Sequence, residues 1–156
     1  GIDLGGDFLS EGPWKASLVT VEGGDLSLDD IEHRILRPIW QEPRVHYAVN
    51  CAAVGCPNLK RSAWRAESLE ADLDAAARAY INHPRGVALR TVDGRPHLIV
   101  SKIYDWFAED FGGSEASVLA HLRAHAEGET AEVLADLNHI HGTAYDWTLN
   151  DLKVVR

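Results

Sequence analysis

The amino-acid sequence predicts an α+β fold in which a small antiparallel sheet packs with helices. Short β-branched segments alternate with longer segments of helical period, as at residues 17–21 and 67–82. Turn signals between strands outnumber the long crossovers that parallel sheets require, and Asp93-Gly94 between two apolar runs is a hairpin signal. No repeat or linker-like tract interrupts the chain, so we expect one domain over residues 1–156.

Charge and composition exclude several classes of protein. The 24 acidic side chains outnumber the 15 basic ones and give a net charge of −9. This charge repels phosphate backbones, so we expect no nucleic-acid partner. No apolar run approaches the ~20 residues of a membrane-spanning helix, so we expect no membrane span. Apolar residues make up 46% of the chain and charged residues 25%, as in globular proteins rather than disordered or coiled-coil chains.

The first elements expected are a strand at residues 17–21 and a helix that begins after Ser27. Ser27 is a good N-cap residue. Asp29 and Asp30 then occupy the first turn, where acidic side chains interact favourably with the helix dipole. Pro38 is expected to end this helix.

A second strand is expected at residues 45–49, where the sequence VHYAV follows Pro43. Residues 50–58 are small and include Gly and Pro, so they predict a tight loop. Apolar residues at helical spacing predict a long amphipathic helix over 67–82, and Pro84 comes directly after its end.

The C-terminal half is predicted to contain the hairpin and several short helices. The strands 87–92 and 97–101 flank the turn dipeptide, and a helix over 103–111 is expected to bury Trp106 against the sheet. The remaining elements are expected to be a helix capped by Ser114, a short helix near 131–137 and an extended tail at 145–149.

Cys51 is the candidate nucleophile. It follows the predicted strand at once and lies in the small-residue loop 50–58. Small neighbours allow a substrate to approach a thiol, and a strand end holds the thiol in place. The backbone amides of residues 52–55 are candidates for an oxyanion hole.

A thiol becomes a nucleophile when a neighbouring base or a helix dipole favours the thiolate. His33 and His46 are the candidate bases, because they are the histidines nearest to Cys51 in the sequence. Glu32 or Asn50 is then the group that orients the imidazole, as the third member of a catalytic triad does.

Cys56 allows several interpretations. Pro57 is suited to the first position of a helix, whose dipole would lower the pKa of the Cys56 thiol. The spacing also permits a Cys51–Cys56 disulfide, and buried structural thiols are a further alternative. Lys60 and Arg61 lie beside the loop and either bind a substrate carboxylate or are ordinary surface residues.

Histidines of the C-terminal half suggest a possible zinc site. His121 and His125 share one helix face, and His139 and His141 would share one strand face. Leu122 stands where a metalloprotease helix would carry its Glu, which favours a solvated helix face over a metal site. We therefore expect no metal and no other cofactor.

Four segments together resemble one known family. They are LSLDDIEHRILRP at 26–38, PRVHYAVNCAAVGCPNL at 43–59, SKIYDWFAEDFGG at 101–113 and YDWTLND at 145–151. In this order they are similar to the bacterial and plant domain of unknown function family 547. The resemblance implies an α+β domain similar to the papain and transglutaminase-like thiol enzymes. The family pattern falls on Glu32, His33, Arg37, His46, Asn50, Cys51, Cys56, Pro57, Ser101, Trp106, Asp110 and Phe111.

The resemblance carries three further implications. Family members begin with an upstream helix bearing an Asn-x-Tyr-Asn-Ala motif, so this chain is expected to lack an upstream helical part of the domain. Bacterial members often carry export signals, which favours an exported or periplasmic address over a cytoplasmic one. Plant members attach the domain to coiled-coil segments, which suggests a role in protein interaction.

These observations lead to two main functional hypotheses. The first is a thiol-dependent hydrolase or transferase acting on a peptide, amide or γ-glutamyl bond, with a Cys51 nucleophile and a histidine base. Its partner would be a peptide or small amide substrate, with Arg37, Cys56, Lys60 and Arg61 as candidate binding residues. The second is a non-catalytic interaction module with structural cysteines and a protein partner. A histidine-bound metal protein is the third possibility.

Overall fold

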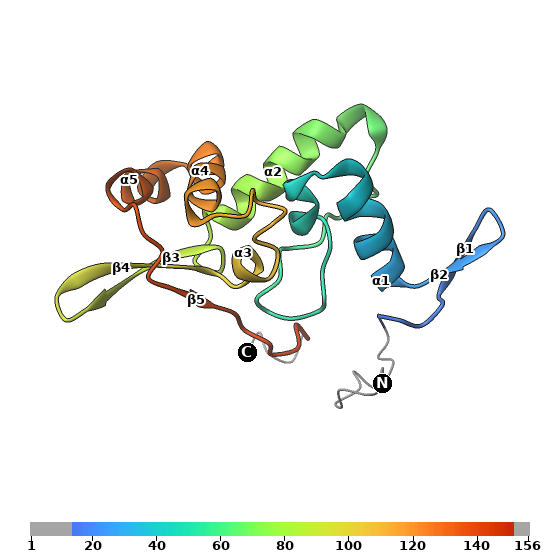
Figure 1. Cartoon of the computed structure of the whole chain (residues 1–156), viewed down its shortest axis with the longest axis horizontal. Helices are drawn as coiled ribbons and strands as arrows, with labels where there is room; N and C mark the ends of the chain where they lie inside the picture. The colour runs from blue at the N-terminus through green and yellow to red at the C-terminus, as the bar shows by residue number, and fades with distance from the viewer. Residues whose placement is uncertain (1–13, 152–156) are drawn as a thin grey trace. The chain divides into compact units, whose positions relative to one another are not determined.

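The computed structural model describes residues 14–151 (Figure 1). The chain divides into two compact units, Gly1–Glu42 and Pro43–Arg156. Each unit contains helices and one small sheet, which confirms the predicted α+β class. The expectation of one domain over 1–156 stays a prediction.

The first described strands of this unit form a hairpin. β1 (Val19–Val21) pairs antiparallel with β2 (Gly24–Leu26), and this confirms the end of the strand predicted at 17–21. The turn between them places Glu22 at φ 50° and Gly23 at φ 83°. Two successive left-handed residues form the turn that matches the twist of a tight hairpin.

A capped helix follows the hairpin. α1 (Leu28–Asp30) continues directly into η1 (Ile31–Trp40), a stretch of wider π-helical turns. The Ser27 hydroxyl accepts the Asp30 backbone N–H at 3.0 Å, and the Asp30 carboxylate accepts the Ser27 N–H at 3.0 Å. This reciprocal capping box confirms Ser27 as the N-cap.

The prediction that Pro38 ends this helix is wrong, because the helix continues to Trp40. Proline disrupts an α-helix by lacking an N–H for the carbonyl four residues before it and by crowding that carbonyl. Wider π turns change this spacing, so the ring can be accommodated. The helix ends where Gln41 adopts a left-handed conformation at φ 50°.

The second unit begins with η2 (Pro43–Tyr47), a 3₁₀ helix where the sequence predicts a strand at 45–49. That prediction is wrong. His46 and Tyr47 are neighbours and both are buried, whereas alternate residues of a half-buried strand face opposite ways. The helical turn packs the Tyr47 ring near Tyr80 of α2 and the His46 ring on Phe107, so tertiary packing overrides the β propensity of this segment.

The long predicted helix at 67–82 is confirmed. η3 (Ala66–Ser68) leads into α2 (Leu69–Ile81), whose buried face carries Leu73, Ala77, Tyr80 and Ile81. Helix α4 packs against both α2 and α5, and these three helices lie on one side of the sheet in the view of Figure 1.

The main sheet has three strands in the order β3-β4-β5. β3 (Val87–Val92) and β4 (Arg95–Ser101) form the predicted hairpin, with Asp93 at φ 50° and Gly94 at φ 74° in the turn. β5 (Gly142–Ala144) pairs parallel to β4 and was not predicted. It directs the following tail, residues 145–151, away from the sheet edge and toward the cysteine loop.

The C-terminal helices are α3 (Ile103–Trp106), α4 (Glu115–His125) and α5 (Gly128–Asp136). α4 begins at the predicted Ser114 cap, and α5 begins three residues earlier than predicted. α3 is shorter than the expected helix at 103–111. The expectation that Trp106 is buried is wrong, because it is 39% exposed and the core takes Ile103, Tyr104 and Phe111 instead.

The register of the hairpin offers a matched stability test. Leu98 is fully buried and lies directly opposite Leu89, which is 44% exposed. Leu98→Ala should lower the free energy of unfolding by about 2–5 kcal/mol, because it leaves a cavity in the core. Leu89→Ala should lower it by less than about 1 kcal/mol. Urea denaturation of both variants checks this, and equal losses would contradict the difference in burial between these two cross-strand neighbours.

Candidate functional site

The two cysteines and one tyrosine meet in a cluster that we call the thiol site, made of Cys51, Cys56 and Tyr145. The two Sγ atoms lie 2.6 Å apart, and both cysteines are free thiols. The Tyr145 hydroxyl lies 3.2 Å from the Cys51 Sγ and 3.0 Å from the Cys56 Sγ. Cys56 is buried, whereas Cys51 is half-buried. Cys51 is therefore the sulfur that an external molecule reaches more easily.

Asn50 holds the loop that carries the two thiols. Its side-chain carbonyl accepts the Ala52 backbone N–H at 2.6 Å, and its side-chain amide donates to the Pro57 carbonyl at 2.6 Å. The two ends of the loop are thereby tied to one side chain. Both polar ends of Asn50 bond to loop backbone, so its hydrogen bonds position the thiols and do not include an imidazole among the residues described.

The C-terminal tail closes over the loop through backbone hydrogen bonds. The Val54 N–H donates to Thr148, and the Gly55 N–H donates to Asp146, each at 2.8 Å. A Cβ on Gly55 would lie 2.8 Å from the Asp146 backbone nitrogen, so only glycine permits this approach. The docked tail is what brings Tyr145 to the two sulfurs.

The predicted oxyanion hole at 52–55 is not open in this arrangement. Three of its amides donate within the protein: Ala52 to Asn50, Val54 to Thr148 and Gly55 to Asp146. The Ala53 backbone lowers the pKa of both thiols. This loop therefore uses its amides to hold its own shape and to stabilise a thiolate.

Buried Tyr80 and half-buried Arg85 hold the loop backbone through hydrogen bonds. The Tyr80 hydroxyl donates to the Gly55 carbonyl at 2.7 Å and lies 2.8 Å from the Ser101 hydroxyl. The Arg85 guanidinium donates to the carbonyls of Val54 and Cys56 at 3.1 and 2.8 Å. These bonds satisfy carbonyls that the tight loop would otherwise leave without partners.

Hydrogen bonding changes the pKa values of the two thiols in opposite directions. The contact with the Cys51 sulfur, the Tyr145 hydroxyl and the Cys51 N–H together lower the pKa of Cys56 to about 5 against the opposing effect of burial. The same bond to Cys56 raises the pKa of Cys51. Burial and these contacts raise the pKa of Tyr145, so its hydroxyl remains a donor. These contacts therefore favour a thiolate at Cys56 over a thiolate at Cys51.

His46, one of the two predicted bases, lies elsewhere in the second unit. Its Nε2 lies 2.7 Å from a carboxylate oxygen of Asp110, and its ring stacks on Phe107 with centroids 4.1 Å apart. Within residues 14–151, the two sulfurs are hydrogen-bonded to each other, to the Tyr145 hydroxyl and to the Cys51 N–H, and to no imidazole. The role of His46 as a base stays a prediction.

The other predicted base, His33, lies on η1 of the first unit. Its Nδ1 is 2.9 Å from an Arg37 guanidinium nitrogen, and its Nε2 is 3.7 Å from an Asp29 carboxylate oxygen. Glu32 is its neighbour in the sequence. These contacts form a polar row on the helix, and the roles predicted for Glu32, His33 and Arg37 stay predictions.

The predicted binding residues Lys60 and Arg61 follow the loop. The Lys60 amine forms an ion pair with Asp72 and lies over the Trp64 ring at 5.2 Å from its centroid. Arg61 is exposed. The charge of Lys60 is thus matched within the protein, and binding of a substrate carboxylate by either residue stays a prediction.

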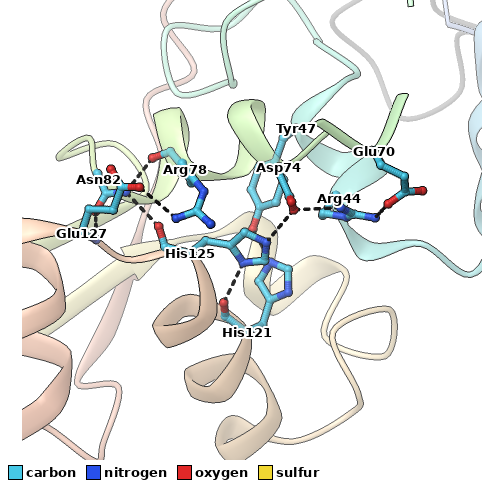
Figure 2. A network of polar contacts seen from close by, with 9 residues as sticks. All are labelled: Arg44, Tyr47, Glu70, Asp74, Arg78, Asn82, His121, His125 and Glu127. Carbon is cyan, nitrogen blue, oxygen red and sulfur yellow. Dashed lines mark hydrogen bonds and ion pairs between the residues drawn. The ribbon is translucent and has the colours of Figure 1, made fainter. Parts of the chain in front are cut away.

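His121 and His125 join a polar network rather than a solvated helix face (Figure 2). The Nε2 of His121 lies 2.9 Å from the Tyr47 hydroxyl. The Nε2 of His125 lies 3.5 Å from the Asp74 carboxylate, which also accepts from Arg44 at 2.8 Å. The network ties η2 and α2 to α4.

The other two histidines also have protein partners. His139 bonds to Glu115 at 2.9 Å, and the Nδ1 of His141 accepts the Leu98 backbone N–H at 3.1 Å. Over the described part of the chain, no group of three or more His, Cys, Asp or Glu side chains is arranged to hold a metal ion. The histidines therefore act here as links between elements.

Tyr145 is the site residue that reasoning from sequence missed. It lies 94 positions from Cys51 and reaches it only because β5 and the tail return to the loop. Its place in the YDWTLND segment was the available signal, but spacing alone gave it no partner.

Ala52 provides a test of strain beside Cys51. Its φ of +63° is left-handed, a conformation that is costly for residues other than glycine. Ala52→Gly should raise the free energy of unfolding by about 0.5–1 kcal/mol, because glycine adopts this φ without the Cβ clash. The control Ala53→Gly, at a buried neighbour without positive φ, should lower it by about 1 kcal/mol. Thermal or urea unfolding measures both, and a loss of stability in Ala52→Gly would refute the strain.

Comparison with known proteins gives one match. The family model described as "Protein of unknown function, DUF547" matches residues 7–81, which include the cysteine loop. No curated protein and no solved structure shows significant similarity to this chain. Within the described residues, every helix is too short or too polar to traverse a lipid bilayer. The family resemblance drawn from the sequence motifs is thus confirmed, because residues 7–81 match the DUF547 family model.

Proposed function

We propose that this chain is a thiol-dependent hydrolase or transferase that acts on a peptide, amide or γ-glutamyl bond at the thiol site. One observation carries the proposal: the Cys51 sulfur, the Cys51 N–H and the Tyr145 hydroxyl lie 2.6–3.1 Å from the Cys56 sulfur and lower its pKa, which favours a thiolate in the pair. A thiolate is the nucleophilic form of cysteine. Purely structural thiols need no such arrangement of donors.

Cys51 is the attacking atom in this proposal, because it is more exposed than Cys56. The proton between the two sulfurs can move to Cys56, which leaves the negative charge on Cys51. The Cys51 sulfur then forms a bond to the substrate carbonyl carbon, and the carbonyl electrons move to oxygen. When the tetrahedral intermediate collapses, the C–N bond breaks, the amine takes the proton from Cys56, and a thioester remains on Cys51.

The second half of the reaction reverses these proton movements. Water attacks the thioester in a hydrolase, and an acceptor amine attacks it in a transferase. Cys56, now a thiolate, takes the proton of the attacking group, and the bond to the Cys51 sulfur breaks. His33 or His46 is the alternative carrier of this proton, with Glu32 or Asn50 as the orienting group predicted for a triad.

A second candidate function is thiol–disulfide exchange, which the 2.6 Å separation of the sulfurs favours. Cys51 would attack a disulfide of a substrate protein and form a mixed disulfide, releasing one substrate thiol. Cys56 would then attack the Cys51 sulfur, release the second substrate thiol and close a Cys51–Cys56 disulfide. Two electrons pass from the cysteine pair to the substrate.

The third candidate function is that of a non-catalytic interaction module. In that case the buried Cys56 and the bonds around it serve packing alone, and a partner protein binds elsewhere on the surface. The same experiment distinguishes the three functions.

The test compares hydrolysis of peptide and γ-glutamyl p-nitroanilides by the reduced wild-type chain, Cys51→Ser and Cys56→Ser. Cys51→Ser should lose about 10³-fold or more in kcat/KM, as expected for removal of a nucleophile, with an unchanged circular dichroism spectrum. Cys56→Ser should lose less. Mass spectrometry should trap the acyl group on Cys51.

Other outcomes assign the site differently. Reduction of insulin disulfides that needs both cysteines, without p-nitroaniline release, would favour exchange over hydrolysis. Slow alkylation of both reduced thiols by iodoacetamide at neutral pH, no faster than that of free cysteine, would overturn both chemical proposals and favour the interaction module.

A further inference from the structure

Three aromatic rings stand beside the thiol site. Trp106 and Tyr145 have centroids 4.8 Å apart, Trp106 and Trp147 are 5.2 Å apart, and Tyr145 and Trp147 are 4.8 Å apart. We call these three residues the aromatic cluster. Although packed together, Trp106 remains 39% exposed and Trp147 remains 65% exposed. Much of their apolar surface therefore faces solvent.

Tyr145 belongs to both the aromatic cluster and the thiol site. Its ring packs on the two tryptophans, while its hydroxyl lies 3.2 Å from the Cys51 sulfur. Only the Tyr145 side chain therefore separates a molecule bound at the Cys51 sulfur from the exposed indoles. Exposed aromatic surface next to a reactive group is typical of a ligand-binding site.

The spacing of the rings decides between kinds of ligand. A cage for a quaternary ammonium ion needs rings on different sides of the cation, each within about 6 Å of it. Centroids 4.8–5.2 Å apart leave no such gap, because the rings are in direct contact. The rings are also tilted by 42–64° to one another, which forms a corner rather than the flat face on which a sugar stacks. A corner of tilted rings suits another aromatic ring packed edge to face.

The charges around the cluster favour a ligand that carries a basic group next to its aromatic ring. Asp105 precedes Trp106 and Asp146 lies between Tyr145 and Trp147, and both carboxylates are exposed. Hydrogen bonds from Thr148 lower the pKa of Asp146, which keeps it ionised. Lys102 is the cation nearby, with its amine 5.9 Å from the Trp106 centroid. The whole chain carries a net charge of −9.

We propose that the aromatic cluster is the substrate subsite of the thiol site and takes an aromatic side chain of a polypeptide, next to a basic group. This inference deepens the proposed function, since it rests on a reactive thiol at Cys51. It holds equally for amide cleavage and for thiol–disulfide exchange. It also explains why a residue at helical core spacing, Trp106, is kept at the surface.

The test uses thiol alkylation by two electrophiles that differ in one ring, N-benzyl chloroacetamide and N-methyl chloroacetamide. Rates with the reduced wild-type chain, each divided by the rate with free cysteine, should favour the benzyl compound by about fivefold, the effect of one aromatic contact. Trp147→Ala should bring the ratio of the normalised benzyl and methyl rates close to one. Trp40→Ala is the matched control, because Trp40 is 62% exposed in the first unit, and it should retain the preference.

A charged pair of reagents tests the second part. The 4-(aminomethyl)benzyl compound should react faster than the 4-carboxybenzyl compound at low ionic strength, and added salt should reduce the difference. Equal normalised rates for the benzyl and methyl reagents, at a methyl rate above that of free cysteine, would overturn the subsite while leaving the thiol chemistry intact. Slow reaction with every reagent would instead overturn the proposed function. Protection of Cys51 by a soluble chitin oligosaccharide, but not by an aromatic peptide, would assign the cluster to sugars and overturn this proposal.

Discussion

The docking of the C-terminal tail on the cysteine loop is the interaction on which the site depends. Hydrogen bonds from Val54 to Thr148, from Gly55 to Asp146 and from Asn150 to Ala52 join two segments far apart in the sequence. Glycine at position 55 permits the close approach, since a Cβ would meet the Asp146 backbone. Without this contact the sulfurs would lose the Tyr145 hydroxyl, and the exposed tryptophans would not lie beside a thiol.

Burial and hydrogen bonding act in opposite directions on the two thiols. Removing a sulfur from water disfavours its anion, yet the pKa of Cys56 is lowered because donors from Cys51 and Tyr145 converge on it. The same contact between the sulfurs raises the pKa of Cys51. The two cysteines therefore titrate as a unit that shares one proton, so that one sulfur carries the proton when the other carries the charge. Movement of one proton exchanges these roles, which is the physical basis of the proposed chemistry.

Local signals predicted most of the fold. The Ser27 and Ser114 caps, the hairpin turn at Asp93-Gly94 and the helix at 67–82 depend on residues close in sequence. Predictions failed where distant packing decided. Residues 45–49 were predicted as a strand from their β propensity, but His46 and Tyr47 are both buried in a helical turn.

The site was predictable only in part, for the same reason. Asn50, Cys51 and Cys56 lie within one loop, so adjacency alone brought them together. Tyr145 contacts both sulfurs from 94 and 89 positions away, and Asp110 reaches His46 from 64 positions away. No spacing rule links such residues. The pairing of β5 with β4 brings Tyr145 to the sulfurs, and the packing around η2 brings Asp110 to His46.

The ionisation of the two thiols tests the central claim most directly. Thiolate absorbance in the ultraviolet, followed against pH in the reduced chain, should show one thiolate forming far below the ordinary midpoint of ~8.5, near pH 5, and the second only well above it. Tyr145→Phe should move the first midpoint upward, since the variant removes a donor to the thiolate. Tyr104→Phe, whose hydroxyl bonds to Tyr47 instead, should not move it. Two thiols that titrate together near ~8.5, unaffected by Tyr145→Phe, would contradict a shared proton at this site.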